Sequence, residues 1–121
     1  MANTFKVVTF AAEPASAGTA YKMYTLAGST TTVVLGLILT NIHTSAVTVE
    51  VELVSDTGSR GGANNVTNGT SFLVKDVNIP AGSSLEVLTG GKVVMETTDY
   101  LNIDCSVADK LSGTLSIMEI T

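Results

Sequence analysis

Apolar and polar residues alternate along two stretches of this chain with the two-residue period of a half-buried β-strand. In residues 47–53, Val and Leu side chains alternate with Thr48, Glu50 and Glu52. In residues 101–107 the same alternation places Cys105 among the apolar positions, where a free cysteine packs as a small hydrophobic side chain. Both stretches are predicted to be strands with one face on a hydrophobic core.

A third stretch, residues 31–42 with the sequence TTVVLGLILTNI, is apolar at odd and even positions alike. Val33 and Leu35 fall on one side of an extended strand, whereas Val34 and Ile38 fall on the other. Such a pattern is typical of a strand that is covered on both faces. A second subunit is one candidate for the second cover.

Six further segments have strand composition and are bounded by Gly, Pro, Asn, Asp or Ser. They are Thr4–Ala11, Ala20–Leu26, Ser71–Ile79, Ser84–Leu88, Lys92–Glu96 and Thr114–Ile120. Short turn segments separate several of the strands, namely HTSA at 43–46, PAGSS at 80–84, Gly90–Gly91 and ADKLSG at 108–113. Turn residues of this kind predict hairpins, so successive strands are expected to be antiparallel neighbours.

These segments predict an all-β fold, either an antiparallel β-sandwich or a jelly-roll-like barrel of about eight to nine strands. With 121 residues the chain has the size of one domain, so residues 1–121 are assigned to a single β-sandwich domain. The one long segment without strand character is 55–71, which is rich in Gly, Asn and Ser. A long irregular loop in a small domain is usually functional or mobile.

Composition excludes several kinds of partner and location. The net charge of −5 leaves no cluster of Lys and Arg for a phosphate backbone, so nucleic acid is not expected as a partner. No signal peptide and no apolar run of membrane-spanning length are recognised, and no membrane partner is expected. Because 45% of the residues are hydrophobic and only 14% are charged, assembly into a larger structure is favoured.

Catalytic chemistry is weakly represented in the sequence. Asp56, Thr57, Gly58 and Ser59 resemble the active-site turn of aspartic proteases, which need a second carboxylate from a second copy of the motif or from a dimer mate. Retroviral-type members also have a downstream apolar-Gly-Arg segment that supports the site, and nothing in this sequence matches it. An Asp-Thr-Gly turn after a strand is the favoured interpretation. His43 is the only histidine and is expected in a turn, and Cys105 is the only cysteine. No enzyme activity, metal or cofactor is predicted.

The C-terminal half contains Ile79–Leu85 as Ile-Pro-Ala-Gly-Ser-Ser-Leu, Gly91–Glu96 as Gly-Lys-Val-Val-Met-Glu, and a final strand ending in Glu-Ile-Thr. In these segments the chain resembles small virion structural proteins of tailed phages, especially those of marine cyanophages. The resemblance implies a capsid decoration or cement protein that is made in the host cytoplasm and located on the virion. It further implies a homo-oligomer, for which a trimer is one option, bound to a larger protein such as the major capsid protein.

Candidate contact residues for such partners come from the 55–71 loop and from the first strand. They are Arg60, Asn64, Asn65, Val66, Asn68, Phe5 and Phe10. The alternative function is a tail, neck or fibre accessory module that uses the 55–71 loop to bind a receptor or a carbohydrate. With three Tyr, three Phe and no Trp, the chain offers few aromatic rings for stacking on sugars.

Overall fold

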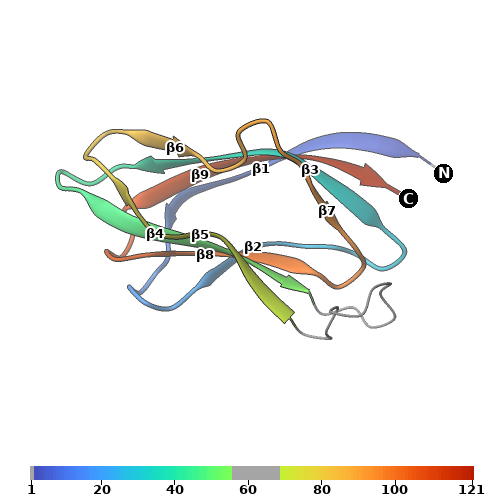
Figure 1. The fold of residues 1–121 in the computed structure, drawn as a ribbon, viewed down its shortest axis with the longest axis horizontal. Helices are drawn as coiled ribbons and strands as arrows, with labels where there is room; N and C mark the ends of the chain where they lie inside the picture. The colour runs from blue at the N-terminus through green and yellow to red at the C-terminus, as the bar shows by residue number, and fades with distance from the viewer. Residues whose placement is uncertain (1, 56–68) are drawn as a thin grey trace.

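Two antiparallel β-sheets form the fold of the computed structural model, which describes residues 2–55 and 69–121 (Figure 1). The described residues contain nine strands: β1 (Asn3–Glu13), β2 (Tyr21–Thr25), β3 (Thr31–Asn41), β4 (Val47–Ser55), β5 (Gly69–Ile79), β6 (Ser84–Glu86), β7 (Val93–Met95), β8 (Tyr100–Cys105) and β9 (Leu111–Ile120). Every strand predicted from the sequence is present, and the predicted all-β sandwich is confirmed.

Strands from both halves of the chain contribute to each sheet. Sheet A has the order β1-β9-β3-β6, and β7 also pairs with β3. Residues 38–40 of β3 pair with β6 and residues 32–34 pair with β7, so these two short strands occupy one side of β3 in turn. Sheet B has the order β2-β8-β4-β5. The two sheets lie as separate layers in Figure 1.

The pairing follows a simple rule, in which the early strands pair with the late strands in reverse order. β4 pairs with β5, β3 with β6 and β7, β2 with β8, and β1 with β9. The chain is therefore one long hairpin, with β4 and β5 at its closed end, that is rolled up so that its arms alternate between the two sheets. This is the arrangement of a jelly roll. Its two ends lie side by side, and Ala2 and Thr121 exchange both backbone hydrogen bonds.

The prediction that the short turns form hairpins is wrong. The turns at 43–46, 80–84 and 108–113 each carry the chain from one sheet to the other, and Gly90–Gly91 lies between β6 and β7, which pair with β3 and not with each other. Hairpins and inter-sheet corners use the same turn residues, so turn chemistry does not distinguish them. Ser55 and residues 69–71 belong to strands, which shortens the predicted 55–71 loop at both ends.

β3 does not have the two covered faces that its sequence predicts within the part of the chain described. Thr32, Val34, Leu37, Leu39 and Asn41 are buried on the inner side of sheet A. The register shifts between Val34 and Gly36, so Ile38 lies on the same outer side as Val33 and not on the opposite side, as simple alternation predicts. On this outer side Val33 is half-buried and Ile38 is exposed. The inner cover is sheet B, and the outer apolar side chains have no covering layer among residues 2–55 and 69–121.

A single core of apolar side chains fills the space between the sheets. Its buried members include Val34, Leu37, Leu39, Val47, Val49, Val51, Ile79, Met95, Leu101, Ile103, Leu111, Leu115 and Ile117. Phe10 joins this core opposite Gly113, and its ring contacts Tyr21 edge-on at 5.3 Å. A Cβ atom at Gly113 would lie within 3 Å of the Phe10 ring, so this strand glycine provides the space that the ring occupies.

Asn41 closes one end of the sandwich, where two inter-sheet turns meet. Its side-chain Nδ2 donates to the carbonyl oxygens of Ser45 at 2.9 Å and Ile79 at 3.0 Å, and its Oδ1 accepts from the His43 amide at 2.8 Å. All three polar positions of this fully buried amide are therefore satisfied. The predicted turn role of His43 is confirmed, because its amide completes this network.

Candidate interaction surface

An unbroken row of apolar side chains crosses the outer face of sheet A. In the strand register Phe5 of β1 is opposite Met118 of β9, Met118 is opposite Val33 of β3, and Val33 is opposite Val94 of β7. Residues opposite each other in an antiparallel pair point to the same face of the sheet. Phe5 is 72% exposed and Val94 is 56% exposed, and these two side chains form the ends of the row.

Further apolar side chains flank this row. Val7 and Ile38 are exposed, and Leu35 and Ile120 are half-buried. None of these four side chains belongs to the core or packs against it. We call this set, with Phe5, Met118, Val33 and Val94, the outer apolar patch. Contiguous exposed apolar surface of this kind typically marks an interaction site.

Charged residues are absent from the outward positions of the three longest strands of sheet A. The outward positions of β1, β3 and β9 carry Asn, Thr, Ser, Gly, Ala and the apolar side chains named above. The side chains of Lys6 and Glu119 point to the inner side of the sheet, where they form an ion pair with each other. These three strands therefore contribute no charge to the outer face, although the chain has a net charge of −5. A charge does lie beside the outer apolar patch, because the exposed Glu86 of β6 is opposite Ile38.

Sheet B presents a contrasting outer face. Glu50, Glu52 and Asp104 lie on neighbouring strands of this face, together with Lys22 and Lys75. The Lys75 ammonium lies 2.9 Å from Glu50 Oε1, and this hydrogen bond raises the pKa of the lysine. Such a charged and hydrated face requires no covering layer.

Two aromatic rings of sheet B, the exposed Phe72 and the half-buried Tyr100, are already in contact with lysine side chains. The Lys22 ammonium lies 4.0 Å from the centre of the Tyr100 ring, and the Lys75 ammonium lies 4.7 Å from the centre of the Phe72 ring. Both distances are those of cation–π contacts. One face of each ring is therefore not free to stack on a ligand.

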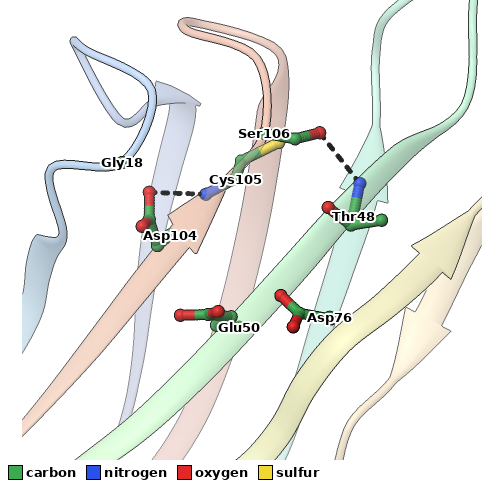
Figure 2. A pocket seen from close by; sticks show the side chains of 7 residues that line it. All are labelled: Gly18, Thr48, Glu50, Asp76, Asp104, Cys105 and Ser106. Atoms are coloured by element: carbon green, nitrogen blue, oxygen red, sulfur yellow. Dashed lines mark hydrogen bonds between the residues drawn. The ribbon is translucent and has the colours of Figure 1, made fainter.

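A polar hollow of about 190 Å³ opens on sheet B and is shown in Figure 2. Gly18, Thr48, Glu50, Asp76, Asp104, Cys105 and Ser106 line it. The Thr48 amide donates to Ser106 Oγ at 3.0 Å, and the Cys105 amide donates to Asp104 Oδ1 at 2.8 Å. The first bond joins the beginning of β4 to the residue after β8, and the second lies between adjacent residues of β8, so both are structural contacts of the strands.

The hollow contains no arrangement of catalytic or metal-binding type among the described residues. Within residues 2–55 and 69–121, no group of three or more His, Cys, Asp and Glu side chains could hold a metal ion. Ser106 has no histidine beside it in the hollow, because His43 lies in the turn after β3. Cys105 is buried, as its position on the apolar side of the strand predicted.

A polar bridge links the two sheets near the ends of the chain. The Tyr24 hydroxyl of β2 donates to Glu119 Oε2 of β9 at 2.5 Å and also contacts the Thr32 hydroxyl at 2.8 Å. The Lys6 ammonium lies 2.7 Å from Glu119 Oε1. Bonds from Lys6 and Tyr24 lower the pKa of Glu119. Burial, followed by the bond to Glu119, raises the pKa of Tyr24 to about 12.

The contact residues predicted from the sequence are distributed over different parts of the molecule. Phe5 lies in the outer apolar patch, whereas Phe10 is only 8% exposed and belongs to the core, which places it away from any contact surface. The remaining candidates Arg60, Asn64, Asn65, Val66 and Asn68, and the Asp-Thr-Gly turn at 56–58, lie outside the described residues. Met118 and Val94 were missed, because their position in one row with Phe5 follows from strand pairing.

Comparisons with known proteins add a fold likeness only. No family model and no curated protein matches the sequence. Among solved structures, the chain is similar to one from a study of Bacillus endospore appendages, described there as disulfide-linked pili. The two share 16% identity with a TM-score of 0.49, over 99% of this chain and 87% of the other.

No helix in the described part of the chain is long and apolar enough to span a membrane.

Proposed function

We propose that this chain is a non-enzymatic structural protein of a tailed-phage virion, of the capsid decoration or cement type, and that it forms homo-oligomers on the particle. The observation that carries the proposal is the difference between the two outer faces of the sandwich. The outer face of sheet A has the outer apolar patch and no charge on the outward positions of its three longest strands, with Glu86 on the edge strand β6. Sheet B has a charged outer face. A protein with one apolar and one hydrated face is suited to packing in an assembly.

The resemblance of residues 79–121 to small virion structural proteins supplies the virion part of the proposal. Jelly rolls occur in viral capsid proteins and also in lectins and cupins, so the fold alone does not select a function. The polar hollow on sheet B adds no argument for catalysis, because its two hydrogen bonds are backbone contacts at the adjoining ends of β4 and β8.

A tail, neck or fibre module that binds a receptor or a carbohydrate is the alternative location and role. The aromatic side chains of the described residues give this binding role less support than the decoration role has. Lysine ammonium groups lie over the rings of Tyr100, which is half-buried, and Phe72, which is exposed, where a sugar would otherwise stack.

The test uses particles of the phage that encodes the chain. Mass spectrometry of purified particles should detect the chain in many copies, and a map of the intact particle should place it on the capsid surface. Purified protein should also rebind to particles from which it has been stripped. Absence of the chain from purified particles, with no rebinding, would overturn the virion proposal.

A further inference from the structure

We infer that the outer face of sheet A is a self-association surface, on which two copies of this chain pack face to face through the outer apolar patch. This inference rests on the proposed structural function and names the partner of one of its surfaces. It follows from the strand register, from the distribution of charge, and from the size of the face.

The strand register of sheet A produces a row of apolar side chains that can pack against the same row of a second copy. In order across sheet A the row is Phe5, Met118, Val33 and Val94. A two-fold axis parallel to the strands and midway between β9 and β3 reverses this order in the second copy. Phe5 of one copy then lies over Val94 of the other, and Met118 lies over Val33. The most exposed ring of the row thus meets a smaller side chain, and each contact occurs twice, as in an isologous interface.

Charge favours a second copy as the occupant of this face. Two molecules that each carry a net charge of −5 repel each other, and the carboxylates of Glu50, Glu52 and Asp104 lie on the outer face of sheet B. Packing through sheet A keeps these carboxylates on the far sides of the two copies. The outward positions of β1, β3 and β9 contribute no charge that would have to be desolvated, and the outward Glu86 lies on β6 at the edge of the sheet.

The face is large enough for a stable dimer. Three neighbouring strands, about 4.8 Å apart and about ten residues long at about 3.3 Å per residue, present about 480 Å². The two three-residue strands β6 and β7 add about 100 Å² along one side of β3. Two such faces bury about 1,100 Å² before the relief of the side chains is counted, which exceeds the value of about 1,000 Å² expected for a specific protein–protein interface. The two sheets A would stack as the two sheets of a sandwich do.

Sedimentation velocity over a range of protein concentrations tests this arrangement, with three matched variants. Val94→Glu and Phe5→Glu place a carboxylate at opposite ends of the row. Phe72→Glu introduces the same change at a 44% exposed aromatic residue of sheet B and serves as the control. We expect the wild type and Phe72→Glu to be dimers. The dissociation constant of either sheet A variant should be at least about 100-fold higher, because burial of an unpaired charge is strongly unfavourable.

Thermal unfolding of each variant, followed by circular dichroism, verifies that the substitutions at these exposed positions leave the fold intact. If only the Phe5→Glu variant dissociates to monomers, face packing is overturned and the dimer contact is assigned to the edge of sheet A formed by β1. The reason is that Val94 lies on β7, at the other edge of the sheet. Dissociation of Phe72→Glu alone would assign it to sheet B. Both outcomes would leave the proposed structural function in place.

A strictly monomeric wild type would also overturn the inference. If that monomer rebinds to stripped particles and Val94→Glu abolishes rebinding, the outer apolar patch contacts a larger virion protein in place of a second copy. If the monomer does not rebind either, both the inference and the proposed function fail. Rebinding of the monomer therefore distinguishes failure of the inference alone from failure of both.

Discussion

The Tyr24 hydroxyl and Glu119 Oε2 lie 2.5 Å apart, although 95 positions of sequence separate the two residues. Tyr24 belongs to β2 of sheet B and Glu119 to β9 of sheet A, so the bond crosses the sandwich. Lys6 of β1 completes the group from the other side of the carboxylate. This bridge fastens the end of the sandwich where the two termini meet, and it makes stability depend on pH.

The polar bridge should stabilise the protein over a defined pH range. The folded state lowers the pKa of Glu119, so its contribution is present above the ordinary carboxyl pKa and is lost as pH falls through the folded value. The folded state raises the pKa of Tyr24 to about 12, so its contribution is complete below the ordinary value of 10 and is lost as pH rises through 12. Urea denaturation at a series of pH values measures both losses.

Glu119→Gln should flatten the acid limb of this stability profile, because the substituted side chain no longer titrates. Tyr24→Phe should flatten the alkaline limb for the same reason. Glu86→Gln is the matched control, since the Glu86 carboxylate makes no ion pair among the described residues. An acid limb that is unchanged in Glu119→Gln would contradict the assigned role of the bridge.

Asn41→Ala should destabilise the fold strongly. The substitution removes two donors and one acceptor from the buried corner, and leaves the carbonyls of Ser45 and Ile79 and the His43 amide without their side-chain partner. Each buried polar group left unpaired costs about 1–3 kcal/mol, so a loss of about 2–5 kcal/mol in the free energy of unfolding is expected. Urea denaturation measures this loss.

Asn78→Ala is the control for the corner, because Asn78 lies exposed on β5 one residue before Ile79. This variant should change the free energy of unfolding by no more than about 0.5 kcal/mol. Equal losses in the two asparagine variants would show that the buried network does not determine the effect.

Gly113→Ala should destabilise the core by about 1–3 kcal/mol, the usual cost of overpacking. The added methyl group would occupy the space of the Phe10 ring, which Tyr21 holds from another side. Gly36→Ala is the matched control, because a Cβ atom at this glycine of the neighbouring strand meets no atom within 4 Å. Thermal unfolding should distinguish the two variants.

A second substitution identifies the cause of the Gly113 effect. Phe10→Leu shortens the side chain that blocks the position, so Gly113→Ala should cost less in that background than in the wild type. The difference is the coupling energy of a double-mutant cycle. Additive losses would mean that Gly113 is required for a reason other than the Phe10 ring.

Local patterns in the sequence were sufficient to find the strands and their buried faces. The alternation in residues 47–53 and 101–107 corresponds to β4 and β8, and it placed Cys105 in the core correctly. The pairing of strands was not accessible in this way. A turn such as PAGSS at 80–84 has the same composition whether the next strand lies in the same sheet or in the opposite one.

Only part of the outer apolar patch could be predicted from the sequence, again because strand pairing does not follow from local patterns. Apolar residues on both sides of residues 31–42 indicated a second cover for β3, and Phe5 was named as a contact residue. That Met118 lies between Phe5 and Val33 depends on β9 being inserted between β1 and β3. Such an insertion joins the two ends of the chain, and no local pattern encodes it.

Cys105 provides the last prediction, a probe of the core that needs no substitution. The thiol is 3% exposed, so an aromatic disulfide reagent should modify the native protein only when the sandwich opens. The rate of modification should therefore rise with urea in parallel with unfolding, and the fully unfolded chain should react at once. Rapid modification of the native protein would mean that the edge of sheet B near the polar hollow opens independently of the core.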